Sequence, residues 1–380
     1  MIVSGFPFST PPIAPSRMDF LNFESPKLAT IAVSGSIHSK ESEMSSSFQV
    51  EFKKKLHEFF EVRERICDAD FLVLFNHNEK MIKNYRALGH NKENVILIRT
   101  EPFSVFPAQY KPRVENMYSL IISPGNVSSN GSAKSRINWP YTYLPNPLVP
   151  VERSESIGEL VKSESLRSLF DYEKWSQRNI PISLVASNKY SPIKGSNYEF
   201  RRYYAKNSNT EILKVYGTNW NRDFFSSFIS RLKVIYFSLK NYYVPTNLSV
   251  FSGIFEKYPT YVDTVENKHS IVQASKFSLV IENDDNYISE KLLDAVVGGS
   301  IPLYIGPRIN AQIFPVDLVL QINPGEDLTL KMEKMTESKV RDWQETALKF
   351  LKSEGFTQNY TEEAVHKRIV GLIRDHIQGV

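Results

Sequence analysis

Residues 276–307 read KFSLVIENDDNYISEKLLDAVVGGSIPLYIGP. An apolar run at 277–281 predicts a buried strand, and the polar residues 282–288 predict the loop that follows it. Apolar residues at helical spacing predict a helix over 290–297, which two consecutive glycines end. A second apolar run at 301–305 predicts the next strand. This strand–loop–helix–strand unit is a building block of parallel α/β sheets.

The loop of this unit carries a cluster of polar side chains. Ser289 can cap the helix, whose first backbone N–H groups are then available to an anion. Open α/β sheets bind ligands at the carboxyl ends of their strands, which is where this loop lies. The pattern therefore predicts a nucleotide or sugar-nucleotide site, with a plain solvated loop as the alternative. The candidate donor-binding residues of the loop and helix are Glu282, Asn283, Tyr287, Ser289, Glu290 and Lys291.

Similar apolar, β-branched runs predict two sets of buried strands along the chain. The first set lies at 28–33, 71–75, 95–98 and 118–122, and the second lies at 182–186, 213–216, 277–281 and 301–305. A helix is predicted after the first strand, over 51–65. Alternation of strands and helices indicates parallel sheets with covering helices.

A chain of 380 residues with two sets of strands predicts two domains. A polar stretch at 146–176, rich in Pro, Ser and Glu, separates the sets, and we place the boundary there. The tail from residue 342 onward predicts two helices, the last capped by Thr361. The expected organisation is a loose lead-in at 1–27, a first domain at 28–175, a second domain at 176–345 and C-terminal helices at 346–380.

Composition excludes several classes of protein. With 41% hydrophobic and 23% charged residues, the chain is not disordered, collagen-like or a coiled coil. The net charge of +4 does not gather into long basic runs, so no nucleic-acid partner is expected. The one cysteine, Cys67, excludes an intramolecular disulfide and a cysteine zinc cluster. With no apolar run of membrane-spanning length and no expected signal peptide, we expect a cytoplasmic protein.

The order of residues in 276–307 resembles the signature of the α-1,3/4-fucosyltransferases, glycosyltransferase family 10. The shared positions are Phe277, Glu282-Asn283, Tyr287-x-Ser289-Glu290-Lys291 and Ile301-Pro302-x-x-x-Gly306. The stretch departs from the family in two places. The loop between Asn283 and Tyr287 is shorter than usual, and Ser289 stands where threonine is typical. The short loop bears on how the base and ribose are recognised.

Weaker parallels lie upstream. Ser187-Asn188 closes a predicted strand and precedes an Arg-Arg pair, an order in which the family places an arginine that meets the donor diphosphate. Arg201 and Arg202 both match, and the sequence does not choose between them. Glu101 follows the strand at 95–98, where the family places its proposed catalytic base. The alternatives are a solvated helix face for the arginines and an ordinary strand-end residue for the glutamate.

The resemblance implies a GT-B-like fold, in which two Rossmann-like domains, the first for the acceptor and the second for the GDP-sugar, face a central cleft. It implies an inverting transfer of L-fucose from GDP-fucose to a hydroxyl of an oligosaccharide or glycolipid. Glu101 would take the hydroxyl proton, Lys291 and an arginine would stabilise the departing GDP, and Glu290 would hold the ribose hydroxyls. Tyr287 would help to hold the diphosphate or the fucose. No cofactor or metal is obligatory, although a divalent metal could be stimulatory.

The acceptor itself is not identified by the sequence. Residues 126–138 and the aromatic stretch 139–143 are expected to shape its site. The basic and aromatic residues 231–243, RLKVIYFSLKNYY, allow a peripheral membrane contact, although a buried helix or strand is the favoured interpretation. The oligomeric state is not readable.

Two other functions stay open. Glu282 and Glu290 imitate the Glu-x7-Glu spacing of some retaining enzymes, so a GT-B glycosyltransferase with another nucleotide-sugar donor is one alternative. A non-catalytic nucleotide- or glycan-binding relative is the other, and the presence of both Glu290 and Lys291 counts against it.

Overall fold

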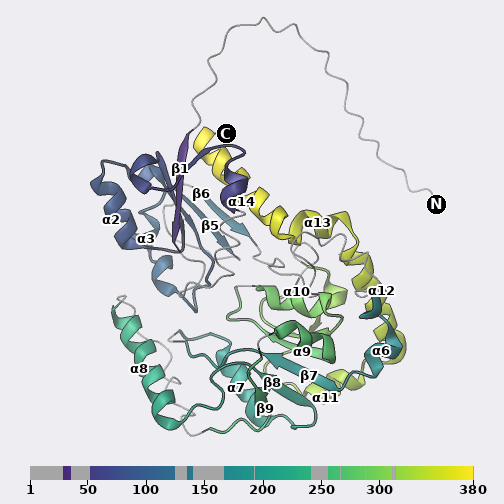
Figure 1. The fold of residues 1–380 in the computed structure, drawn as a ribbon. Coiled ribbons are helices and arrows are strands. Elements are labelled where there is room, and N and C mark those ends of the chain that lie inside the picture. Colours follow the sequence, from purple (N-terminus) through teal and green to yellow (C-terminus); the bar gives the residue numbers. More distant parts are fainter. Residues whose placement is uncertain are drawn as a thin grey trace, which may run out of the picture.

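The computed structural model describes residues 29–35, 52–124, 135–139, 167–191, 193–240, 256–265, 267–286, 288–309, 311 and 314–379. These residues form two six-stranded sheets in which every strand pair is parallel. Figure 1 shows the two sheets in separate halves of the molecule, each with covering helices. The predicted fold class, two α/β domains built on parallel sheets, is confirmed.

The first sheet has the strand order β2-β1-β3-β4-β5-β6. Its strands are β1 (Thr30–Gly35), β2 (Glu61–Arg63), β3 (Phe71–Phe75), β4 (Val95–Ile98), β5 (Leu120–Pro124) and β6 (Ser135–Trp139). The central strands are apolar on both faces because separate hydrophobic clusters cover both. Helix α2 (Glu79–Ala87) contributes Ile82 and Tyr85 to one of these clusters.

The second sheet has the strand order β12-β11-β10-β7-β8-β9. Its strands are β7 (Ile180–Val185), β8 (Leu213–Tyr216), β9 (Tyr261–Asp263), β10 (Ser275–Ile281), β11 (Ile301–Ile305) and β12 (Leu320–Gln321). Numbered along the chain, this is the 3-2-1-4-5-6 order of dinucleotide-binding domains. The direction of strand progression reverses between β7 and β10, and ligands bind beside such a reversal.

Helices complete the second half and return the chain to the first. In the described part of the chain, the named α-helices that follow β6 are α6 (Tyr172–Ser176), α7 (Tyr198–Asn207), α8 (Phe224–Lys240), α9 (Lys268–Ala274), α10 (Glu290–Val297), α11 (Leu328–Glu333), α12 (Glu337–Leu351), α13 (Glu354–Tyr360) and α14 (Glu362–Gln378). Helix α14 packs Val365, Ile369 and Ile373 against the first sheet. The end of the chain therefore completes the core of the first domain, as the yellow helix beside β1 shows in Figure 1.

The tail differs from the expectation in one respect. Thr361 caps the last helix as predicted, accepting a hydrogen bond from Ala364 N. The residues from 342 onward nevertheless belong to three helices and not two, because Ser353 caps α13 separately through Phe356 N.

The helix predicted over 51–65 is wrong in its second half. Of the described residues in this range, 52–56 are helical, and 61–63 form strand β2 beside β1. The apolar spacing that predicted the helix holds for Phe52, Leu56 and Phe60, which are all buried in one cluster. The charged residues of β2 lie at a sheet edge and give no apolar signal.

Two further departures concern the region between the domains. Phe170 and Trp175 precede the predicted boundary at 175/176 but pack in the second core, which therefore starts before β7. Strand β6 lies partly within residues 126–138, which were expected to be an acceptor loop. Residues 126–134 and 140–143 lie outside the described part of the chain.

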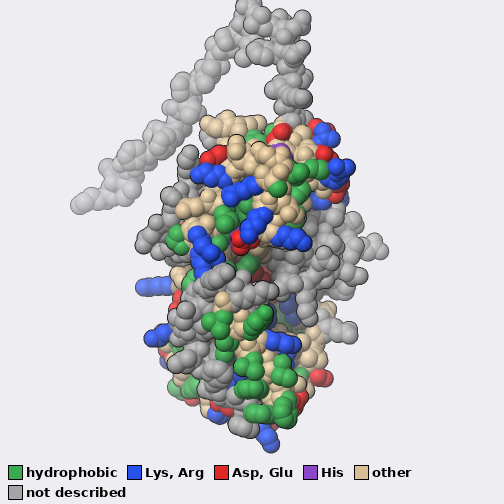
Figure 2. All heavy atoms as spheres, turned by 90° about the vertical axis from the view of Figure 1, so that its left-hand side faces the viewer, with side chains coloured by type: hydrophobic (Ala, Val, Ile, Leu, Met, Phe, Trp, Pro, Cys, Tyr) green, Lys and Arg blue, Asp and Glu red, His purple; other side chains and the backbone are tan. Residues whose placement is uncertain are grey.

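Helix α8 has an unusual surface. Figure 2, which views the molecule from the side of α8, shows apolar side chains gathered over the lower half of that face. Of the helices in the described residues, none is long and apolar enough to cross a membrane.

The packing of α14 gives a stability prediction. Ile369→Ala removes a side chain that is 1% exposed, and we expect it to destabilise the first domain by about 2–4 kcal/mol. The measurement is hydrogen exchange of strands β3 and β4, which should become faster. Lys367→Ala, at an exposed position of the same helix, is the control and should leave exchange unchanged. Unchanged exchange in the Ile369 variant would show that α14 does not hold this sheet.

Candidate active site

The site begins at the strand reversal of the second sheet. Strands β7 and β10 pair in parallel, so the loops that leave their carboxyl ends start at the same edge. The loop after β7 covers residues 186–191, and the loop after β10 runs through 282–289 to the start of α10. All the donor-binding residues predicted from the sequence, apart from the two arginines, lie in the second loop or at that helix start.

Buried side chains hold the loop after β10. Arg201 donates to the carbonyl of Ile281 at 2.7 Å and to Asn283 Oδ1 at 2.9 Å. Glu282 is fully buried and accepts from the backbone N–H of Ser289 at 2.9 Å. Burial raises the pKa of the Glu282 carboxyl, while Lys291 and the Ser289 bond act in the opposite sense. Glu282, Asn283 and Arg201 thus fix the shape of the loop.

Two charged side chains at the start of α10 are partly exposed to solvent. Ser289 caps the helix by accepting from Lys291 N, and Lys291 Nζ donates to the same hydroxyl at 2.8 Å. The side chains of Glu290 and Lys291 are 32% and 26% exposed. Lys291 Nζ lies 3.8 Å from Glu290 Oε1. A carboxylate and an ammonium therefore sit beside a helix N-terminus, where the helix dipole favours an anion.

Lys268, from α9, is a member of this cluster that the sequence did not reveal. Its ammonium is 3.8 Å from Glu290 and 2.5 Å from the buried Asp294 on α10. Burial acts to lower the pKa of Lys268, but the carboxylates of Asp294 and Glu290 together raise it. Glu290 therefore lies between two ammonium groups, which orient its carboxylate.

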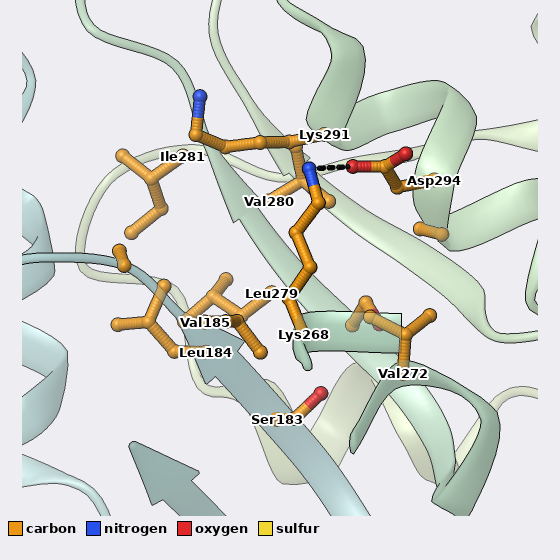
Figure 3. Close-up of a pocket in the computed structure, with 13 residues that line it drawn as sticks. Ser183, Leu184, Val185, Lys268, Val272, Leu279, Val280, Ile281, Lys291 and Asp294 are labelled. Carbon is orange, nitrogen blue, oxygen red and sulfur yellow. Dashed lines mark ion pairs between the residues drawn. The ribbon is translucent and has the colours of Figure 1, made fainter. Parts of the chain in front are cut away.

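Figure 3 shows the small cavity beneath this cluster, between β7, β10, α9 and α10. Its volume is about 40 Å³, with the Lys268–Asp294 ion pair on one side and Leu184, Val185 and Leu279 on the other. Nucleotide-sized ligands need several hundred Å³. The cavity is therefore packing space behind the cluster and not a ligand site.

The loop after β7 brings in a second lysine that the sequence did not reveal. Lys189 is exposed at the surface, yet desolvation by the atoms around it lowers its pKa, and the charges of Glu101, Arg201, Lys291 and Glu290 act on its ammonium. Charged groups of both domains therefore influence Lys189. No residue pattern marks Lys189, because its neighbours come from distant parts of the chain.

The structure distinguishes the two arginines. Arg202 donates to the Lys189 carbonyl at 2.8 Å and lies over the Tyr190 ring, on the side of the loop after β7. The charges of Glu282 and Glu290 act on Arg201. Arg201 is thus the arginine on the side of the candidate donor site, although it is only 3% exposed.

Glu101 follows β4 in a loop that buried polar groups define. Gln109 Nε2 and Tyr110 Oη donate to the Glu101 carbonyl at 2.9 and 2.8 Å. Arg99 pairs with Glu115 at 2.8 Å, with both side chains at most 1% exposed. The backbone around Glu101 is therefore fixed, and the Glu101 carboxylate acts electrostatically on Lys189 and on Tyr198 of the second domain.

Direct hydrogen bonds join this loop to the second domain. Ser104 N donates to Asp284 Oδ2 at 3.2 Å, and Ser191 Oγ donates to the Ser104 carbonyl at 2.7 Å. Asp285 accepts from Asn197 Nδ2 at 2.9 Å. Asp284 therefore links the two domains, while Asp285 ties the loop after β10 to the start of α7. In the described residues no group of three or more His, Cys, Asp or Glu is placed to hold a metal ion.

The structure thus places Glu290 and Lys291 at the start of α10, which Ser289 caps, and joins the loop that carries Glu101 to the loops after β7 and β10. Tyr287 lies outside the described residues. The absence of an obligatory metal or cofactor stays a prediction.

No protein-family model and no curated protein matches the chain. Solved structures do match it. The structure of HepE from Anabaena in complex with UDP is 9% identical, covers 91% of this chain and 99% of that chain, and has a TM-score of 0.51. An α1,3-fucosyltransferase structure is 14% identical and has a TM-score of 0.47. The match covers 96% of this chain and 93% of that chain. WaaG, a glycosyltransferase involved in lipopolysaccharide biosynthesis, is 9% identical and has a TM-score of 0.44. The match covers 90% of this chain and 100% of that chain.

The fold is GT-B-like. The two parallel sheets and the likeness to HepE establish this, and the GT-B-like fold predicted from the sequence is confirmed. At such low identity the likeness bears on the fold alone. Membership of family 10 and transfer of fucose are not established by it.

The buried pair behind Glu101 gives the second prediction. Glu115→Ala leaves the Arg99 guanidinium buried without its carboxylate, and we expect a loss of about 3–5 kcal/mol of stability. The double variant Arg99→Met, Glu115→Leu removes both charges and should lose much less. Denaturant unfolding of the two proteins tests this. Equal losses would mean that the cost comes from packing and not from an uncompensated charge.

Proposed function

We propose that this protein is an inverting glycosyltransferase that moves L-fucose from GDP-fucose to a hydroxyl of an oligosaccharide or glycolipid. One observation carries the proposal. At the strand reversal of a GT-B-like fold, the exposed Glu290 and Lys291 stand at the start of α10, and hydrogen bonds from Ser104 join the loop that carries Glu101 to this edge of the second domain. This is the set that a nucleotide-sugar transfer needs: a base, a ribose acceptor and cations for a diphosphate.

The donor side follows from the start of α10. Lys291 and the backbone N–H groups behind Ser289 would meet the diphosphate, and Lys189 would approach it from the loop after β7. The Glu290 carboxylate would accept hydrogen bonds from two ribose hydroxyls. Arg201 and Glu282 are too deeply buried for direct contact with an open cleft. We assign them to positioning the loop after β10 and assign Asn283 to the same task.

The chemistry would proceed by a single displacement. The Glu101 carboxylate accepts the proton of the acceptor hydroxyl while that oxygen forms a bond to the anomeric carbon. The bond from the anomeric carbon to the β-phosphate oxygen breaks, and GDP leaves with the electron pair. Lys291 and Lys189 stabilise the charge that develops on the leaving diphosphate, so these side chains supply the electrostatic catalysis. Attack opposite to the leaving group inverts the anomeric configuration.

The order of residues from Phe277 to Gly306, similar to that of family 10, supports fucose as the transferred sugar. The solved structure of HepE holds UDP, so a different nucleoside diphosphate on a related fold is the main competitor. A donor screen with GDP-fucose, GDP-mannose and UDP-sugars, followed by determination of the product anomer, separates these possibilities. A retained anomeric configuration would contradict the proposed mechanism.

The third prediction concerns the base. In Glu101→Gln the side chain keeps its shape but cannot take the proton, so transfer from GDP-fucose should fall by about 10²–10⁴-fold. GDP affinity measured by calorimetry should stay within about twofold. Glu93→Gln is the matched control, because Glu93 is exposed and precedes β4, at the end of the strand opposite to Glu101. Near wild-type transfer by the Glu101 variant would place the base elsewhere.

The fourth prediction concerns the donor site. Glu290→Ala combined with Lys291→Ala should abolish GDP binding in calorimetry, because ribose and diphosphate contacts are both lost. Lys331→Ala, which removes a surface ion pair on α11, is the control and should bind GDP normally. Retained binding in a folded double variant would refute the assignment. Adding a chelator to wild type tests the expectation that no metal is obligatory, since binding and transfer should persist.

A further inference from the structure

Helix α8 carries its apolar side chains outward. Its 17 residues, Phe224–Lys240, would normally present large apolar side chains to the core. Among the α8 side chains that the structure describes, the buried ones are the small Ser227 and Ser238 and the charged Arg231. Five exposed apolar side chains lie on one side of the helix, and we call them the α8 stripe: Phe225 (73%), Ile229 (48%), Leu232 (43%), Tyr236 (67%) and Leu239 (55%).

The rotation of α8 is fixed from inside. The Arg231 guanidinium lies 4.1 Å from the centroid of the Tyr190 ring, and its Nη2 donates to Tyr190 Oη at 2.7 Å. Arg202 lies against the same ring at 4.5 Å. A helix held by a fully buried arginine cannot roll its apolar side inward without exposing that contact. The outward direction of the stripe is therefore a property of the fold.

The stripe forms one continuous row. Its members are spaced by four, three, four and three residues, so they follow one side of the helix over about 21 Å. Figure 2 shows the corresponding apolar patch on the face that α8 covers. Soluble proteins rarely expose such a continuous apolar surface unless something binds it.

The charges around the stripe favour an anionic partner. The sequence of α8 contains no acidic residue, and it carries Lys233, which is exposed, and Lys240, whereas its Arg231 is buried. Asp223, just before the helix, accepts hydrogen bonds from the backbone N–H and the hydroxyl of Ser226 and so caps the helix. Figure 2 also shows Lys and Arg side chains, with fewer Asp and Glu among them, over the upper half of the same face, where Figure 1 places α2.

A second copy of the chain fits this surface less well. Two α8 stripes packed against each other by a twofold axis would bring Lys233 of one helix toward the same basic helix of the partner. Neither helix offers a carboxylate to pair with it. An anionic bilayer instead accepts the apolar row into its interface and attracts the lysines. A net charge of +4 adds to this attraction.

We propose that the α8 stripe docks the protein on the surface of an anionic lipid bilayer, with α8 parallel to the membrane plane. The sequence pointed to 231–243 for such a contact. In the structure the exposed apolar side chains begin nearer the N-terminus of α8, at Phe225 and Ile229. Arg231 is buried and does not belong to the contact surface. This inference does not depend on the proposed transfer reaction.

The test is sedimentation of the full chain with vesicles of phosphatidylcholine alone or of phosphatidylcholine with phosphatidylglycerol. Wild type should bind the anionic vesicles and bind the neutral ones much less. Leu232→Gln combined with Tyr236→Gln should reduce binding to anionic vesicles by about tenfold or more. Lys233→Gln should reduce it by about fivefold and leave binding to neutral vesicles unchanged. Leu330→Gln, at a 56% exposed position on α11, is the matched control and should bind like wild type.

Both positions of the double variant are exposed, so its circular dichroism and thermal unfolding should match those of wild type. The proposal is overturned if wild type does not bind anionic vesicles, or if the double variant binds them equally well. A wild-type dimer that the double variant dissociates, without vesicle binding, would assign the stripe to a second copy. Unchanged GDP affinity in these variants would show that the surface acts separately from the donor site.

Discussion

The Arg201 guanidinium is the contact on which the candidate site depends most. It is buried in the second domain and bonds at once to the last carbonyl of β10 and to the first amide side chain of the following loop. Burying an arginine is costly unless its donors are used, and the loop supplies the acceptors. Glu282 then fixes the other end of that loop through Ser289, which caps α10. The exposed Glu290 and Lys291 owe their position to these buried groups.

The same loop determines how the two domains meet. Asp284 follows the Arg201-bound Asn283 and receives the backbone N–H of Ser104 from the first domain. Ser191, in the loop after β7, reaches the carbonyl of the same Ser104. The segment that carries Glu101 is thus anchored to both donor-side loops. Helix α14 adds a second connection by completing the first core from the far end of the chain. A cleft built in this way can bring a base and a donor site together although they lie far apart in sequence.

The sequence predicted the eight inner strands of the two sheets and missed β2, β6, β9 and β12. Within the described chain these four are the edge strands of the two sheets. Inner strands of parallel sheets are covered on both faces and read as apolar runs, whereas an edge strand is short and partly solvated, as the exposed residues of β2 and β9 show. The site divides in the same way. Glu290, Lys291 and Ser289 lie in one local motif and were predictable, while Lys189 and Lys268 join them only through the tertiary fold.

The charges around Lys189 and Lys268 suit the roles that the proposed reaction gives these two lysines. Desolvation lowers the pKa of the exposed Lys189, and the positive charges of Arg201 and Lys291 act in the same direction, against Glu101 and Glu290. A bound diphosphate would bring negative charge toward this ammonium and favour its charged form. For Lys268, in contrast, the carboxylates of Asp294 and Glu290 raise the pKa in the protein without a ligand. Lys189 would thus interact with the bound donor, while Lys268 orients the Glu290 carboxylate.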